Sequence, residues 1–150
     1  MDNTEFKKLI QFAMDKEEEA AAFYRDCSER ASHKEMKETF IRMAGEEEGH
    51  KSKIERFNRE NIETGALKKI PNLKISDYLL DMTFRPNMNY AELLVLAMKR
   101  EEKAHTMYTD LAGQVDDPSV SKLFQTLAQE ELKHKLRLET EYDDEVQKEN

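Results

Sequence analysis

The sequence contains a single cysteine, Cys27. One cysteine excludes a disulfide framework, and it also excludes a four-cysteine zinc or iron module within this chain. The first five residues are acidic and lack the basic-then-apolar order of a signal peptide. These two features predict a protein of the reducing cytoplasm.

Turn-forming residues, apolar runs and net positive charge are also scarce. Four glycines and three prolines in 150 residues favour long helices with few turns. No apolar run approaches the roughly 20 residues of a membrane span, so we expect no membrane partner. The formal net charge of −8 argues against nucleic acid as a partner, because phosphate binding needs a basic face. The length suits one hydrophobic core, which predicts a single domain over 1–150.

The chain contains an internal repeat: its first half matches its second half without gaps, at an offset of 84 residues. The repeat pairs residues that bind metals and residues that fill cores. The metal-binding pairs are Glu17 with Glu101, Glu47 with Glu131, and His50 with His134. The core and flanking pairs include Ile10 with Leu94, Ala13 with Ala97, Tyr24 with Tyr108, and Phe40 with Phe124. A doubled helix pair with Glu, then Glu-x-x-His, is typical of a two-metal carboxylate site in a four-helix bundle.

Helical periodicity extends over four segments, which are 4–30, 32–61, 89–111 and 117–146. Three start signals support them: a capping box from Ser32 to Glu35, an N-cap at Asn89 with Glu92 three residues on, and the dipeptide Asp117-Pro118. Gly113 is expected to stop the third helix.

The connection over 62–88 is much longer than the other two and includes an amphipathic piece at 76–84. Its length suits a crossover along a bundle, whereas the short connections make each flanking pair of helices antiparallel. We therefore predict an all-α fold, in which two helical hairpins are joined by a long crossover with a short extra helix.

The repeated acidic and histidine residues have the helical phase of a buried site. Glu47 and His50 are three residues apart and share a helix face, as do their repeat partners. Glu17 lies on the same apolar stripe as Ile10 and Ala13. The predicted ligands are therefore Glu17, Glu47, His50, Glu101, Glu131 and His134. Four buried carboxylates carry −4, which two divalent cations would cancel. Carboxylate and imidazole ligands favour two iron ions, with manganese or zinc as the metals that could replace them.

A metal-free reading stays open. Glutamate is common here, so an isolated Glu-x-x-His motif is weak, and Glu102-x-x-His105 is a third instance. Under that reading the motifs are solvated helix faces. Tyr24 and Tyr108 are predicted to hydrogen-bond the ligand carboxylates of the facing hairpin and to relay protons, with ordinary core packing as the alternative. His105 is expected at the rim, or at the entrance as a proton carrier or spare ligand.

These residues resemble the diiron domain of the rubrerythrins, in the ferritin-like superfamily. The resemblance covers nearly the whole chain. The motifs that carry it are Glu17-x-x-Ala20-x-x-x-Tyr24, Glu47-x-x-His50, Glu101-x-x-Ala104-x-x-x-Tyr108 and Glu131-x-x-His134. It implies a ferritin-like four-helix bundle, a non-haem diiron centre bridged by one glutamate from each hairpin, and reduction of hydrogen peroxide or dioxygen by the diferrous state.

Two departures from that family pattern affect the expected function. The chain lacks a four-cysteine rubredoxin module, so electrons would come from an external donor such as a rubredoxin-like protein or a small reductant. Many peroxide-reducing members also carry an extra carboxylate about one turn from the third-helix ligand. The residues one turn to either side of Glu101 are Ala97, Met98, Ala104 and His105, and none of them is acidic.

Two other functions remain as alternatives: a ferroxidase that handles iron as ferritins do, and a non-enzymatic metal-binding helical module. A homodimer is expected from the apolar residues of the crossover, Tyr78, Leu79, Leu80, Met82 and Phe84. A bundle from one chain and a bundle from hairpins exchanged between two chains both fit the pattern.

Overall fold

The computed structural model describes residues 3–61 and 84–149, and this part of the chain is all-α. Its helices are α1 (Asn3–Arg30), α2 (Lys34–Asn61), α3 (Tyr90–Gln114) and α4 (Pro118–Glu149). Each predicted segment is therefore a helix, although some ends differ. Most of the predicted short helix at 76–84, and the predicted dimer contacts from Tyr78 to Met82, lie outside the described residues. None of the helices in the two described ranges is long and apolar enough to cross a membrane.

Two of the predicted helix starts are confirmed by side-chain caps. The Asn89 carboxamide oxygen accepts from the Glu92 backbone N–H at 2.8 Å, and the Glu92 carboxylate accepts from the Asn89 N–H at 3.1 Å. Asp117 caps α4 by accepting from the N–H groups of Ser119 and Val120, at 2.9 and 3.1 Å. These contacts satisfy N–H groups that have no partner within the helix.

The predicted capping box at Ser32 is wrong. Helix α2 begins at Lys34, and the first intrahelical acceptor is the His33 carbonyl, bonded to the Lys37 N–H at 3.0 Å. Ser32 thus lies one residue before the cap position. Gly113 likewise does not stop α3, which continues to Gln114 before Val115 takes an extended conformation. A glycine in a helix costs only about 1 kcal/mol, which the surrounding packing can offset.

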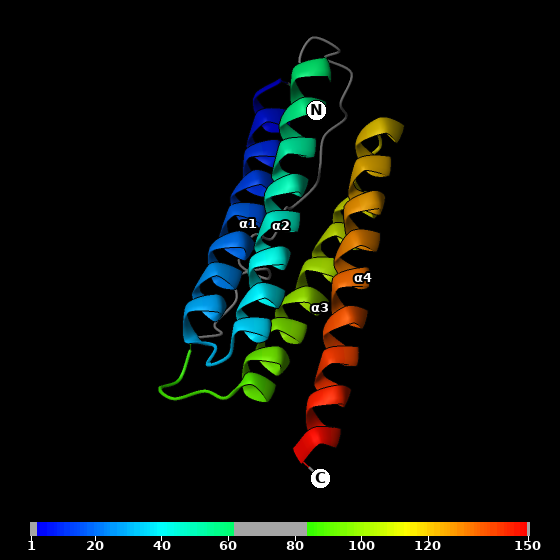
Figure 1. Ribbon diagram of the computed structural model, residues 1–150. Helices are drawn as coiled ribbons and strands as arrows, with labels where there is room; N and C mark the ends of the chain where they lie inside the picture. The colour runs from blue at the N-terminus through cyan, green and yellow to red at the C-terminus, as the bar shows by residue number, and fades with distance from the viewer. Residues whose placement is uncertain (1–2, 62–83, 150) are drawn as a thin grey trace.

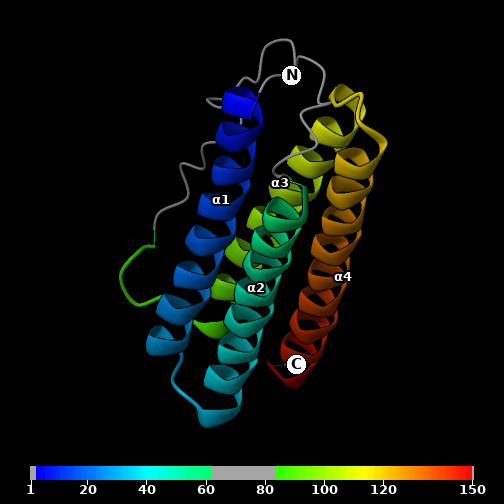
Figure 2. The ribbon, with the colours of Figure 1, turned by 90° about the horizontal axis from the view of Figure 1, so that it is seen from above.

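The helices form two antiparallel hairpins, α1 with α2 and α3 with α4 (Figure 1). Helix α2 ends at the upper end of this view and α3 begins at the lower end, so α2 and α3 run in the same direction. Seen after a turn of 90°, α2 lies in front of α3, with α1 and α4 at either side (Figure 2). In this structure the two hairpins together form the predicted four-helix bundle.

The interior is apolar toward both ends of the bundle. One cluster contains Phe6, Ile10, Ile54, Leu111 and Phe124, and the other contains Phe23, Phe40, Met43, Leu94 and Leu138. All four helices contribute to each cluster. Residues paired in the repeat occupy opposite clusters, as Phe40 and Phe124 do, so the duplication appears in the packing as a pseudo-two-fold relation.

Phe84, which was expected to contribute to a dimer, packs within this chain. Its ring stacks on Phe23 with centroids 5.3 Å apart, and the Arg30 guanidinium carbon lies 4.0 Å from the Phe84 ring centroid. The side chain therefore covers one end of the α1–α2 hairpin. Cys27 is also buried in this region, and burial raises the pKa of its thiol, which makes the thiol inert.

Candidate metal centre

A polar layer lies in the bundle interior between the two apolar clusters. It brings together all six predicted ligands: Glu17 from α1, Glu47 and His50 from α2, Glu101 from α3, and Glu131 and His134 from α4. The carboxylate residues are at most 2% exposed, and His50 is 7% exposed. Four glutamates with so little contact with water need a compensating partner, because burying an unpaired charge is costly.

The six side chains form two overlapping groups of four, and Glu47, His50 and His134 also form a group of three. Glu17, Glu47, His50 and Glu131 make up the first, whereas Glu47, Glu101, Glu131 and His134 make up the second. In each group one potential ligand atom per residue lies within 4.8 Å of all the others. Glu47 and Glu131 belong to both groups of four, which is the arrangement needed for two carboxylates to bridge a pair of ions.

Each histidine reaches a carboxylate of the opposite hairpin. His50 Nδ1 is 2.9 Å from Glu131 Oε1, and His134 Nδ1 is 2.8 Å from Glu47 Oε1. The two imidazole rings lie nearly parallel, with 5.3 Å between centroids and 11° between planes. Both rings therefore present Nδ1 to the interior, where a metal ligand atom must be.

The donor atoms fit a pair of cations better than they fit one another. Each of the six side chains has at least one fully buried oxygen or nitrogen without a hydrogen bond to any described residue, and for Glu47 this is true of both oxygens. The short imidazole–carboxylate distances above lack hydrogen-bond geometry. Buried polar atoms in folded proteins normally have a partner. Carboxylates and neutral imidazoles without thiolate form a donor set suited to iron or manganese.

Electrostatics without metal supports this reading. Burial raises the pKa of Glu47 well above its usual value of 4.5, and the nearby charges of Glu131, Glu101 and Glu17 raise it further. The pKa of Glu131 is raised in the same way, first by burial and then by Glu101 and Glu17. Protons would therefore neutralise the metal-free cluster, and metal ions would have to displace them.

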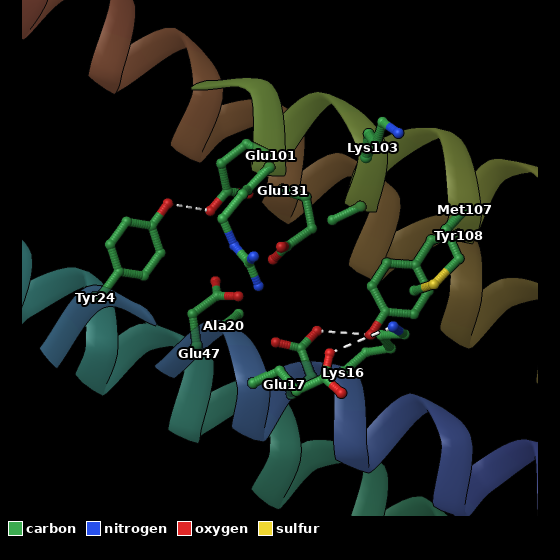
Figure 3. A pocket seen from close by; sticks show the side chains of 13 residues that line it. Lys16, Glu17, Ala20, Tyr24, Glu47, Glu101, Lys103, Met107, Tyr108 and Glu131 are labelled. Carbon is green, nitrogen blue, oxygen red and sulfur yellow. Dashed lines mark hydrogen bonds and ion pairs between the residues drawn. The ribbon is translucent and has the colours of Figure 1, made fainter. Parts of the chain in front are cut away.

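Two tyrosines connect the hairpins beside the cluster (Figure 3). The Tyr24 hydroxyl donates to Glu101 Oε1 at 2.5 Å, and the Tyr108 hydroxyl donates to Glu17 Oε1 at 2.7 Å. Burial and then the adjacent carboxylates raise the pKa of both phenols, so both stay protonated donors. These bonds leave Oε2 of Glu17 and of Glu101 buried without a partner. The geometry matches the predicted contact with the facing hairpin's carboxylates.

Comparison with known proteins agrees with this geometry. The family model described as Rubrerythrin matches residues 8–78 and 92–150. The chain belongs to the rubrerythrin family. Its fold is similar to that of a hypothetical protein from Pyrococcus furiosus, with a TM-score of 0.64 and 23% identity over 90% of this chain and 86% of that one. No curated protein matches the chain.

A small cavity reaches the cluster of this rubrerythrin-family chain between α1 and α3. Its volume is about 40 Å³. Glu17, Glu47, Glu101 and Glu131 turn toward one another on its inner side, with Tyr24 and Tyr108 at either flank (Figure 3). Lys16, Glu19, Arg100 and Lys103 also line it. A few tens of Å³ hold only very small molecules, because one water needs about 10–15 Å³ by the same kind of measure.

Glu46 is a site residue that sequence reasoning missed, because it resembled an ordinary solvated helix position. Its Oε2 lies 2.8 Å from His134 Nε2, on the side of the ring opposite the cluster. Arg137 donates to both Glu46 oxygens, at 2.9 and 2.8 Å. The contact joins α2 to α4, so no local spacing reveals it.

His105, in contrast, lies apart from the cluster. Its Nδ1 is 2.9 Å from the Ala128 carbonyl oxygen, and because a carbonyl only accepts, Nδ1 must be the donor. The ring therefore fastens α3 to α4. It does not line the cavity among the four carboxylates.

Proposed function

We propose that this chain is a non-haem diiron oxidoreductase that reduces hydrogen peroxide or dioxygen with electrons from an external donor, such as a rubredoxin-like protein. The observation that carries the proposal is the pair of overlapping ligand sets that share Glu47 and Glu131. A single ion needs only one such set. Two sets with two common carboxylates suit a coupled pair of ions.

The residues present would hold the pair without excess charge. Glu17 and His50 belong to one position, Glu101 and His134 to the other, and the two shared glutamates lie between them. When bound, an iron pair supplies two electrons, one from each ion, which together with two protons convert one peroxide molecule into two waters. The external donor then restores both electrons.

The protein's own contribution is to limit access and fix the carboxylates. The cavity between α1 and α3 has room for a molecule of the size of peroxide or dioxygen. Electrons from a protein donor would cross the protein matrix, because all six candidate ligands are buried. The Tyr24 hydroxyl donates a hydrogen bond to Oε1 of Glu101, and the Tyr108 hydroxyl donates one to Oε1 of Glu17. Each bond orients a carboxylate that belongs to only one of the two ligand sets.

The test is oxidation of the anaerobically reduced, iron-loaded protein in a stopped-flow spectrometer. We expect oxidation by hydrogen peroxide within seconds, and its loss in Glu47→Ala and Glu131→Ala. Glu48→Ala is the matched control, because Glu48 follows Glu47 on α2 but is 55% exposed and pairs with Arg25. The proposal fails if the loaded protein reduces neither oxidant faster than free ferrous iron does.

The same preparation separates the ferroxidase alternative. A ferroxidase would oxidise many equivalents of added Fe²⁺ per chain and retain the product, and a ferritin-type cage would sediment as a large shell. The proposed oxidoreductase would instead stop after its two resident ions unless a reductant is supplied.

A further inference from the structure

A second groove lies on the opposite side of the cluster from the cavity, between α2 and α4. Its volume is about 280 Å³, and both histidines are among the residues that line it. Four repeat-related pairs line it, namely Glu46 with Glu130, Gly49 with Lys133, His50 with His134, and Lys53 with Arg137. The glutamate and histidine pairs are identical, so the same glutamate–histidine contact could form twice, whereas Lys133 has only Gly49 as its counterpart.

The contacts are not the same. Glu46 Oε2 lies 2.8 Å from His134 Nε2, and two hydrogen bonds from Arg137 hold the carboxylate there. Glu130 instead pairs with Lys133, at 3.3 Å, on its own helix. Within the two described ranges it makes no ion pair with His50. The side chains of Glu46 and Glu130 are equally accessible, at 34% and 32% exposed, so the difference is one of direction and not of burial.

This difference acts on a metal ligand. His134 points Nδ1 inward, and its outer atom Nε2 lies 2.8 Å from an oxygen of the Glu46 carboxylate, so a proton on Nε2 would face an anionic acceptor. An anionic acceptor on the outer nitrogen fixes the ring's orientation and makes the inner nitrogen a stronger donor to a metal. Removing such a partner typically lowers metal affinity about 10–100-fold. Among the described side chains, no carboxylate lies within ion-pair distance of the outer nitrogen of His50, although Glu130 lines the same groove and the charge of His50 lowers the Glu130 pKa.

We propose that the two metal positions are inequivalent, and that Glu46 is the positioning residue that makes the ion held by Glu47, Glu101, Glu131 and His134 bind more tightly than its neighbour. Loading is then sequential, with the His134 position filled first. The inference rests on the proposed metal pair, but it concerns the order and strength of binding and not the reaction.

Single-position variants make the comparison direct. Glu17→Gln removes a ligand of the His50 position only, and Glu101→Gln removes one of the His134 position only. A glutamine carbonyl can still accept the tyrosine hydrogen bond in each case. Mn²⁺ binding to the metal-free variants, followed by electron paramagnetic resonance, reports each dissociation constant. We expect Glu17→Gln to bind Mn²⁺ about 10–100-fold more tightly than Glu101→Gln does.

Three further substitutions assign that difference to Glu46. Adding Glu46→Gln to the Glu17→Gln variant should remove the advantage, whereas adding Glu130→Gln to the Glu101→Gln variant should change the dissociation constant less than threefold. Adding Arg137→Gln to the Glu17→Gln variant removes the two hydrogen bonds that hold the Glu46 carboxylate but keeps the carboxylate itself. It should lower the melting temperature as Glu46→Gln does, and reduce the advantage no more than Glu46→Gln does.

Equal dissociation constants for Glu17→Gln and Glu101→Gln would overturn the inference. So would an unchanged advantage after Glu46→Gln, or a larger loss after Arg137→Gln than after Glu46→Gln, which would assign the effect to docking of the hairpins. Circular dichroism of the metal-free variants confirms that each one is folded before titration. Sequential loading in a protein that reduces neither peroxide nor dioxygen would contradict only the proposed function. Equal sites in a protein that does reduce them would contradict only this inference.

Discussion

Replacing Glu47 with leucine should stabilise the metal-free protein and destabilise the metal-loaded one. Glu47 is 0% exposed, and neither of its carboxylate oxygens has a hydrogen-bond partner among the described residues. Leucine has a similar volume and no polar atoms. The substitution therefore removes two unsatisfied oxygens and one member of a four-carboxylate cluster without opening a large cavity.

The magnitude follows from what is removed. Replacing a whole buried ion pair or triad by apolar side chains of similar volume is neutral or stabilises proteins by about 1–4 kcal/mol, which sets an upper bound for one buried carboxyl that its raised pKa keeps protonated. For a chain of this length, each kcal/mol raises the melting temperature by roughly 2–4 °C. In the wild-type protein, each ion at a thousandfold excess over its dissociation constant contributes about 4 kcal/mol, and Glu47→Leu should lose most of this because both ligand sets include Glu47. The stability order of the two proteins should therefore reverse between chelator and metal.

Differential scanning calorimetry measures this directly, with one scan in chelator and one under anaerobic Fe²⁺. The matched control is Glu48→Leu, whose wild-type side chain is 55% exposed and bonded to Arg25. An exposed ion pair contributes only about 0–1 kcal/mol, so the control should move little in either condition. If metal-free Glu47→Leu melts below the metal-free wild-type protein, Glu47 does not carry an uncompensated burial cost, and the reasoning is wrong.

Three further predictions concern the same cluster. The raised pKa values of Glu47 and Glu131 mean that the folded metal-free protein binds more protons than the unfolded chain, so its stability should fall as pH rises from about 5 to 8. Metal binding releases those protons, so the metal-induced rise in melting temperature should grow over the same range. Tyr24→Phe leaves Glu101 Oε1 without its hydrogen-bond donor. In the Glu17→Gln background it should weaken Mn²⁺ binding at the His134 position about 10-fold. An unchanged dissociation constant would contradict the orienting role of Tyr24. Arg100 lines the cavity with its guanidinium carbon 4.5 Å from the Phe23 ring centroid, and it makes no ion pair in the described part of the chain. We expect Arg100 to hydrogen-bond a small anion in the cavity, for which azide is the probe. A charge-assisted hydrogen bond contributes about 1.5–3 kcal/mol, so Arg100→Gln should weaken azide binding to the oxidised iron-loaded protein at least 10-fold in an optical titration. An equal effect of Lys103→Gln would refute a specific role of Arg100.

The ligand set could be predicted because its signal is local and repeated. Glu47 and His50 share a helix face by their spacing alone, and the offset copy at Glu131 and His134 repeats that face in the second hairpin. Helix phase then places each set toward the apolar stripe, and the structure shows all of these residues buried. The caps at Asn89 and Asp117 were predictable for the same reason, since each cap is a contact within three residues.

The features that the sequence analysis predicted wrongly or missed depend on how one helix is placed relative to another. Ser32 is a residue type that often caps helices, but after the short link from α1 the helix α2 begins at Lys34, two residues beyond Ser32. Glu46 looked like any exposed glutamate, because its partners, His134 and Arg137, belong to the other hairpin. The repeat also concealed this contact. Glu130 has the same residue type at the matching position, but it pairs with Lys133, whose counterpart in the first half is Gly49.

The polar contacts make docking of the hairpins and assembly of the site one process. Tyr24 of the first hairpin holds Glu101 of the second, and Tyr108 of the second holds Glu17 of the first. Each group of four potential ligands likewise takes a shared glutamate from the opposite hairpin. Neither hairpin alone holds a complete ligand set, and neither can satisfy its own buried carboxylates. Ions that bind only the docked arrangement therefore stabilise the interface between the hairpins, and this explains how a repeated helix pair can carry four buried acids at its centre.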